Sequence, residues 1–282
     1  MTHRPRRSVL YMPGAKERAL QKAATLAADA LILDLEDAVA PQDKPAARDL
    51  VARTVAERPY GPREVVIRIN GADTEWGADD LAAAAQARPD AILLPKVESA
   101  AQLATAREVA GDVPLWAMME TPRGILNASE IAAAPGLACL VMGTNDLVKD
   151  LHAAHVPGRA PLIPALAQCL LAARAEGIAA IDGVFNAFKD DEGLRAECEQ
   201  GRDMGFDGKT LIHPAQLSVT NAVYGPSDAA LEEARAQIAA FDAAEGGVAV
   251  HDGRIVENLH VENARRLLAE AEAIAALEAA AS

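Results

Sequence analysis

Two carboxylates in the middle of the chain have the types and the spacing expected of a metal site. Glu120 follows the apolar run VPLWAMM, and Asp146 follows the next run, LACLVMG. Adjacent parallel strands would bring both side chains to one edge, and two carboxylates without His or Cys favour a hard divalent ion. We therefore expect Mg²⁺, with Mn²⁺ as a substitute. The alternative for each residue alone is a carboxylate at a helix start.

A second group of charges follows earlier apolar runs. LDLED places Asp34, Glu36 and Asp37 together, and RIN contains Arg68. A guanidinium can grip a carboxylate or a thioester oxygen of a substrate, and a salt bridge to Glu36 or Asp37 is the structural alternative. Crowded carboxylates raise one another's pKa, which makes Glu36 and Asp37 candidates for an acid or base; equally, they could hold Arg68 and Lys44 in place.

Weaker candidates lie near the two ends of the apolar series. Lys16 follows the first run, close to a predicted helix start, where a cation and free backbone N–H groups could meet a phosphate. His213 follows the last run in LIHP, and a single His of this kind is more often a structural residue than a ligand.

Eight strand-length apolar runs, each followed by an Ala-rich stretch of helical period, must position these residues. Continuous apolarity indicates strands buried on both faces, and helical crossovers allow them to run parallel. The predicted strands are 8–12, 30–35, 64–70, 90–95, 113–119, 137–143, 178–184 and 208–213; the predicted helices are 15–28, 43–57, 79–88, 98–110, 128–134, 164–176, 191–205 and 214–223. The count predicts an α/β fold of the (β/α)8 TIM-barrel type rather than an open doubly wound sheet, because no Gly-x-Gly-x-x-Gly follows the first run.

The remainder of the chain does not fit into such a barrel. Residues 227–281 predict helices around a turn at 246–260, in which HDGR is typical of a hairpin corner. We expect a catalytic barrel domain at 1–225 and a C-terminal helical extension at 226–282. The extension either packs on the barrel or forms a lid over the active site of this or a neighbouring subunit.

Composition excludes several classes of protein. The 282 residues are 51% hydrophobic, and 27 basic against 41 acidic residues give a net charge of −14, so we expect neither nucleic acid nor a membrane surface as a partner. Three scattered cysteines suggest neither a disulfide framework nor a zinc site, and no run has the length of a signal sequence or a membrane span. A cytoplasmic protein is expected.

The motifs together resemble one family of enzymes. RSVLYMPG, LDLEDAVAPQDK, RIN, PKVE, ETPRG, MGTNDL and IHPAQ occur in this order along the chain. The chain is similar over about residues 7–260 to the citrate lyase β-subunit-like branch of the HpcH/HpaI aldolase family. Within that branch LWAMMET, NAFKDDEGLRAECEQGRDMGFDGKTLIHPAQL and GRIVENLH resemble the enzymes that hydrolyse malyl-CoA.

The resemblance implies roles for the candidate residues. It implies Mg²⁺ at Glu120 and Asp146, Arg68 at the substrate, and Glu36 and Asp37 as an acidic pair. It adds residues that hold the acyl-CoA substrate: Tyr11, Met12, Lys16, Asn145 beside Asp146, Ile212 and His213.

The implied activity is Mg²⁺-dependent hydrolysis of (3S)-malyl-CoA to malate and CoA. The first alternative is a malyl-CoA, β-methylmalyl-CoA or citramalyl-CoA lyase, which would release glyoxylate or pyruvate and an acyl-CoA through the same residues; the second is a non-catalytic acyl-CoA-binding subunit. The family resemblance also implies a homotrimer or homohexamer. Several relatives have Asp at the position of Glu257, so the reach of that carboxylate differs here by about one methylene.

Overall fold

Eight parallel strands form a closed barrel in the computed structural model, which describes residues 4–244 and 248–281. The strands are β1 (Ser8–Pro13), β2 (Ala30–Asp34), β3 (Glu64–Arg68), β4 (Ala91–Leu94), β5 (Leu115–Met119), β6 (Leu137–Met142), β7 (Ala179–Asp182) and β8 (Gly208–Leu211). Each strand pairs with the next, and β8 closes the barrel on β1 with Ser8 opposite Lys209. The predicted (β/α)8 TIM barrel is therefore confirmed, and every predicted strand is present.

The strands are apolar throughout because both of their faces are buried. Val9 and Ile32 belong to a cluster that fills the barrel interior, whereas their chain neighbours Leu10 and Leu31 belong to a larger cluster that also contains residues of the surrounding helices. Side chains alternate along a strand, so both layers need apolar residues. The alternation also fixes which residues at the strand ends can face a central cavity.

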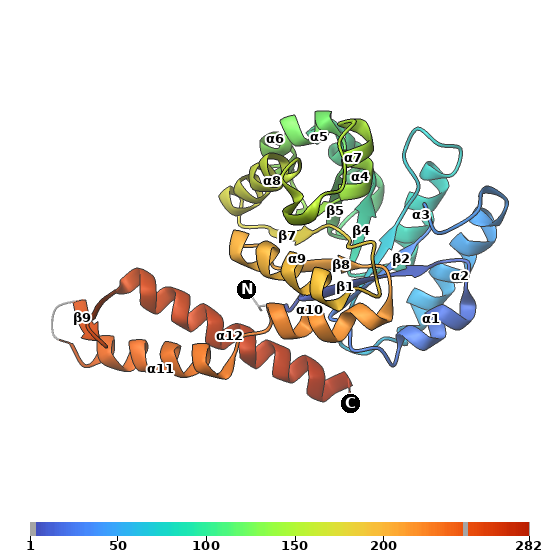
Figure 1. Cartoon of the computed structure of the whole chain (residues 1–282). Helices are drawn as coiled ribbons and strands as arrows, with labels where there is room; N and C mark the ends of the chain where they lie inside the picture. The colour runs from blue at the N-terminus through green and yellow to red at the C-terminus, as the bar shows by residue number, and fades with distance from the viewer. Residues whose placement is uncertain (1–3, 245–247, 282) are drawn as a thin grey trace.

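Helices surround the barrel and connect its strands (Figure 1). The longer ones are α1 (Glu17–Ala23), α2 (Lys44–Glu57), α3 (Gly77–Ala87), α4 (Ala100–Ala110), α8 (Ile163–Ala175), α9 (Asp191–Met204) and α10 (Leu217–Tyr224), each close to a predicted helix. The short helices are α5 (Pro122–Leu126), α6 (Ala128–Ala132) and α7 (Thr144–Asp150). The prediction included α6, at 128–134, but lacked α5 and α7, which begin just after β5 and β6.

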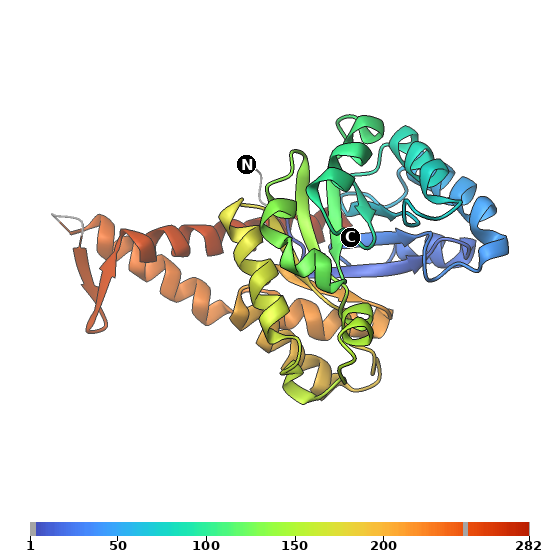
Figure 2. The same ribbon diagram turned by 90° about the horizontal axis from the view of Figure 1, so that it is seen from above.

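A helical extension follows the barrel. It consists of α11 (Asp228–Asp242), a two-stranded antiparallel hairpin of β9 (Val248–His251) and β10 (Arg254–Glu257), and α12 (Asn258–Ala281). Both views show the hairpin at the far end of an arm that projects from the barrel (Figures 1 and 2). At the base of the arm Glu278 pairs with Arg7 at 3.0 Å.

None of the helices within residues 4–244 and 248–281 combines the length and the apolarity needed to span a lipid bilayer. Cys139, Cys169 and Cys198 are free and buried. The proposed division of the chain at 225/226 stays a prediction, although the arm begins close to that point, at Asp228.

Candidate active site

A cavity of about 430 Å³ lies where the strands end. Its lining joins residues at or just beyond the carboxyl ends of seven strands, all except β4: Tyr11, Pro13, Asp34, Asp37, Ala38, Arg68, Met118, Glu120, Met142, Gly143, Thr144, Asn145, Asp146, Val184 and Ile212. This end of a (β/α)8 barrel is where enzymes of this architecture hold their substrates. The two carboxylates of the expected metal site and the arginine of RIN therefore share one cavity.

Glu120 is almost fully buried directly after β5, with 2% of its surface exposed. The backbone N–H of Lys96 donates to Glu120 Oε1 at 2.8 Å, which fixes the carboxylate. Burial raises the pKa of Glu120 to about 7, and the nearby charge of Asp146 contributes to this increase. The start of α5 is capped by Thr121, whose hydroxyl accepts from the Gly124 N–H at 3.0 Å, so Glu120 does not serve as that cap.

Asp146 lies in the first turn of α7 and lines the same cavity. The N-cap position of α7 is Gly143, and the helix has no side-chain cap hydrogen bond, so Asp146 is not a cap. A Cβ atom at Gly143 would overlap the Cβ and Oε2 atoms of Glu120. Glycine at this position therefore leaves the space that lets the first residues of α7 approach the Glu120 carboxylate.

The donor set fits a hard divalent cation. Glu120 and Asp146 offer oxygen ligands without nitrogen or sulfur, as Mg²⁺ prefers, and open cavity volume remains for water and substrate oxygens. The raised pKa of Glu120 shows that the buried carboxylate is not fully compensated by the protein alone. A cation at this point would supply that compensation.

Arg68 makes ion pairs with both expected partners, Glu36 and Asp37, and a further, bidentate pair with Asp34. Its Nε and Nη2 atoms donate to the two carboxylate oxygens of Asp34 at 2.6 and 2.7 Å, a bidentate contact. The remaining Nη1 atom lies 2.8 Å from Glu36 Oε2, out of line for a hydrogen bond, and 3.3 Å from Asp37 Oδ2. The guanidinium also lies 4.8 Å from the ring centre of Tyr11. Asp34 thus holds the arginine in place, and Nη1 faces the acidic side of the cavity.

Glu36 is an acid whose environment favours the protonated form. Burial is the main cause, and the charges of Asp37, Glu120 and Asp34 add to it against the opposing effect of Arg68; together they raise the pKa of Glu36 to about 8. Its backbone is held by Lys44, whose Nζ atom donates to the Glu36 carbonyl at 2.8 Å. The suggestion that the carboxylates hold Lys44 in place is wrong, because Lys44 Nζ donates to the carbonyls of Leu35 and Glu36 and to Asn70 Oδ1.

These pKa values predict a pH dependence of stability. Because the folded pKa values of Glu36 and Glu120 lie above the ordinary value of 4.5, the stabilisation they give is present below that value and is lost as the pH rises through about 7 to 8. The metal-free protein should therefore unfold at progressively lower temperature from pH 6 to pH 8.5, and MgCl₂ should raise the unfolding temperature more at pH 8 than at pH 6. Differential scanning calorimetry measures both.

Glu36→Gln is the matched variant for this prediction. Without one of the two titrating groups, the decrease of the unfolding temperature between pH 6 and pH 8.5 should be clearly smaller. An identical slope in wild type and variant would contradict the raised pKa of Glu36.

The other predicted site residues are placed in different surroundings. Tyr11 and Ile212 line the cavity, and the Tyr11 hydroxyl donates to Met118 Sδ at 3.4 Å. Met12 is buried in the cluster shared by strands and helices, and Lys16 is exposed before α1; neither lines the cavity. His213 is exposed beside the cavity mouth, next to Ile212. Substrate roles for all five stay predictions.

The sequence pattern did not indicate Asn186 and Phe188, two residues near the cavity. Asn145 and Asn186 exchange side-chain amide hydrogen bonds at 3.2 and 2.8 Å, so the loop after β7 holds a residue of the cavity lining. Phe188 stacks on the His213 ring with centroids 4.6 Å apart. Asn186 and Phe188 belong to NAFKDDE, a stretch whose polar and turn-forming residues do not by themselves indicate a functional site.

Comparison with known proteins decides the family. The sequence profile of the HpcH/HpaI aldolase/citrate lyase family matches residues 7–214, which includes all eight strands. The chain belongs to this family. Within it, the chain is 61% identical over 278 residues to the (3S)-malyl-CoA thioesterase of Cereibacter sphaeroides, with 98% of each chain covered.

Two further family members are more distant. The L-malyl-CoA/beta-methylmalyl-CoA lyase of Cereibacter sphaeroides is 36% identical, with 97% of this chain and 96% of the lyase covered. The crystal structure of protein CitE from Mycobacterium tuberculosis in complex with magnesium, acetoacetate and coenzyme A superposes with a TM-score of 0.81 at 34% identity, covering 96% of this chain and all of that one. The family thus includes both hydrolysis and carbon–carbon cleavage of malyl-CoA, and a member that binds magnesium and coenzyme A.

Proposed function

We propose that this HpcH/HpaI family member hydrolyses (3S)-malyl-CoA to malate and CoA in a Mg²⁺-dependent reaction. The observation that carries the proposal is the meeting of Glu120, Asp146 and Arg68 in one cavity at the carboxyl ends of the strands. The 61% identity to a (3S)-malyl-CoA thioesterase over nearly the whole chain supports hydrolysis, and the 36% identity to a malyl-CoA lyase makes lyase activity the second candidate.

Glu120 and Asp146 would hold Mg²⁺, with Mn²⁺ as a substitute, and the bound cation would orient the malyl oxygens and withdraw electron density from them. Arg68 Nη1 faces the same cavity and balances negative charge that develops on the thioester oxygen. Asp37, which lines the cavity, accepts a proton from the attacking water, and Glu36 beside it can do so only in its ionised form. The carbon–sulfur bond breaks as the new carbon–oxygen bond forms, and the leaving CoA thiolate takes up a proton.

Exposed side chains beside the cavity suit the long CoA moiety. Ile212 has 42% of its surface exposed and lines the cavity, and the stacked pair of His213 and Phe188 follows it outward. Tyr11 lines the cavity from β1, the strand that pairs with β8, and the exposed Lys16 offers a cation to a phosphate. We infer that acyl-CoA enters across this side of the barrel mouth.

One assay distinguishes the candidate functions. Purified protein is mixed with (3S)-malyl-CoA and MgCl₂, free thiol is followed with a disulfide dye, and glyoxylate is followed with phenylhydrazine in the same sample. We expect thiol release without glyoxylate, and loss of the signal with EDTA. Glyoxylate without thiol would make the protein a lyase, and no signal in either channel would contradict both activities and favour a binding subunit.

The arm is the basis of a proposal about assembly. The hairpin exposes apolar side chains: Val250 is 69%, Ile255 62% and Val248 52% exposed. Among the described elements, it makes extensive contacts with α11 and α12 alone. Glu257 ends β10, and the hairpin lies at the far end of the arm, away from the barrel (Figures 1 and 2). We propose a homotrimer or homohexamer in which this hairpin covers a neighbour's cavity and presents Glu257 to it.

A mixing experiment tests the shared site. Glu120→Gln and Glu257→Gln subunits, each inactive as a pure assembly, should regain activity when they are co-expressed and assembled together. Random mixing in equal amounts gives about one quarter of sites with an intact cavity and an intact arm, so about one quarter of wild-type activity is expected. A fully active Glu257→Gln assembly, or mixed assemblies without activity, would contradict a site shared between subunits.

A further inference from the structure

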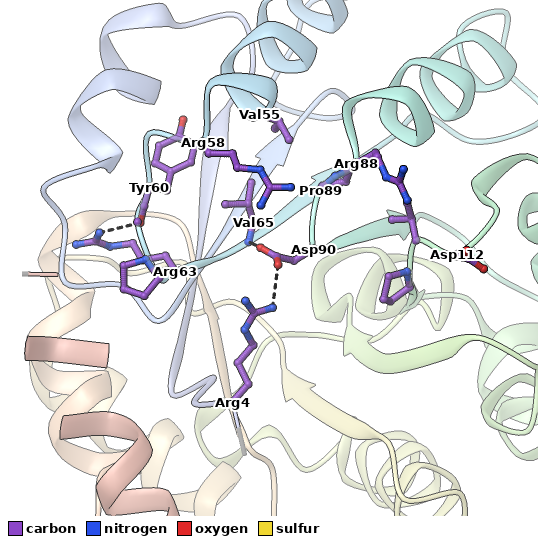
Figure 3. A pocket seen from close by; sticks show the side chains of 14 residues that line it. Arg4, Val55, Arg58, Tyr60, Arg63, Val65, Arg88, Pro89, Asp90 and Asp112 are labelled. Atoms are coloured by element: carbon purple, nitrogen blue, oxygen red, sulfur yellow. Dashed lines mark hydrogen bonds and ion pairs between the residues drawn. The ribbon is translucent and has the colours of Figure 1, made fainter. Parts of the chain in front are cut away.

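Four arginines line a hollow of about 380 Å³ at the end of the barrel opposite the candidate active site, and Figure 3 shows the guanidinium of Arg63 turned away, toward the Tyr60 carbonyl. Arg4 comes from the N-terminal segment, Arg58 and Arg88 directly follow α2 and α3, and Arg63 precedes β3. These positions are at the amino ends of the strands, whereas the cavity with Glu120 is at the carboxyl ends. The hollow is therefore separate from the proposed catalytic chemistry.

Three of the four guanidinium groups lack a carboxylate partner within residues 4–244 and 248–281. Arg4 is paired, with Asp90 at 3.1 Å and Glu64 at 3.5 Å. Arg63 is only 6% exposed and donates to carbonyl oxygens alone, those of Leu26 at 2.9 Å and Tyr60 at 3.1 Å.

Arg58 and Arg88 have exposed guanidinium groups for which the described part of the chain provides no ion pair. The acids in the lining are Asp90, which already pairs with Arg4, and the exposed Asp112. The lining therefore carries an excess of positive charge, although the whole chain has a net charge of −14. A buried or clustered guanidinium without a counter-charge is stabilised when an anion binds.

The backbone conformation at Arg58 and Arg88 supports the view that these positions are arginine because of what the side chains do. Arg58 and Arg88 adopt φ values of 51° and 54°, in the left-handed region, where glycine or asparagine usually ends a helix. A side chain at such a position costs about 1 kcal/mol relative to glycine, and the helix dipole returns at most a similar amount. Two equivalent helix ends nevertheless carry arginine, and both side chains extend over the same hollow in Figure 3.

We propose that this hollow, which we call the arginine pocket, binds a small molecule that carries a diphosphate group. A guanidinium matches a phosphate with two parallel hydrogen bonds, and arginines on three sides of one hollow suit an anion with several oxygens in different directions. The volume is typical of a small-molecule site. Val55, Val65 and Pro89 add an apolar wall against which a sugar or a base could pack. The proposal is independent of the thioesterase assignment.

Calorimetric titration of the metal-free protein with inorganic pyrophosphate tests the proposal. The Arg58→Gln/Arg88→Gln double variant should bind pyrophosphate at least tenfold more weakly than wild type. The charge-matched control is Arg195→Gln/Arg235→Gln, which removes two exposed arginines on α9 and α11 and should bind like wild type. A parallel titration with ADP separates the two sources of the group: tighter ADP binding indicates a nucleotide, and equal binding indicates the diphosphate alone.

A second double variant keeps the result independent of folding. Arg58→Gly/Arg88→Gly should unfold at the temperature of wild type or above it, because glycine relieves the left-handed backbone, and it should still lose pyrophosphate binding. Absence of binding to wild type at millimolar pyrophosphate, equal affinity in the glutamine variant, or equal binding of citrate at the same ionic strength would overturn the proposal.

Discussion

Replacement of Asp146 by asparagine should lower kcat/KM for (3S)-malyl-CoA by about 1000-fold, which corresponds to about 4 kcal/mol of transition-state stabilisation. Asparagine keeps the size of the side chain but removes one of the two carboxylate charges, those of Glu120 and Asp146, that we propose hold the divalent cation. The Mg²⁺-induced increase of the unfolding temperature should disappear together with the activity. Steady-state kinetics and calorimetry with and without MgCl₂ measure the two effects.

Asp150→Asn is the matched control for this prediction. Asp150 ends the same helix, α7, is exposed, and does not line the cavity. This variant should retain wild-type activity and the full response to Mg²⁺. If Asp146→Asn also kept its activity, Asp146 would not be a metal ligand, and the donor set at the cavity would have to be sought elsewhere.

Arg68→Met should destabilise the protein by about 3 to 5 kcal/mol, because it leaves the buried Asp34 carboxylate without its bidentate partner. For a chain of this size we expect the unfolding temperature to decrease by roughly 10 °C. Activity should be lost as well, because Nη1 no longer faces the cavity. Chemical denaturation gives the stability, and the thiol assay at a temperature at which the variant is folded gives the activity.

The control is an arginine whose ion pair is accessible to water. Arg174 pairs with Asp207 at 2.8 Å, and its side chain is 42% exposed. Arg174→Met should cost about 1 kcal/mol or less, because solvent screens such pairs. Equal destabilisation by the two variants would show that burial does not distinguish the Arg68 pair from a surface pair.

The barrel could be predicted because its physical requirement is simple. Strands buried on both faces must be apolar at every position, and ALILD and LWAMM leave no other interpretation between Ala-rich helices. The same requirement indicated where the candidate site lies, because polar residues such as Glu120 and Asp146 come soon after the buried runs. The sequence pattern did not predict the short helix α7 after β6.

The main partner of a buried charge could not be predicted. From the sequence, Arg68 had Glu36 and Asp37 as structural partners, and only the register of β2 and β3, with Asp34 opposite Arg68, makes Asp34 the main one. Lys209 gave no signal either: it is fully buried in β8 and pairs with Asp182 at 3.1 Å. Sequence patterns give the direction of a side chain along its own strand, but a neighbour across the sheet depends on register.

The arm has a small apolar cluster of its own. Ala249, Val256 and Val261 are buried together at its far end and do not belong to the clusters of the barrel. So few buried side chains stabilise only a local unit, which opens more easily than a closed barrel. The opening free energy for amide hydrogen exchange should therefore be far lower in β9 and β10 than in β5 or β6. A subunit that covers the hairpin in the assembled protein would slow the exchange of β9 and β10 selectively.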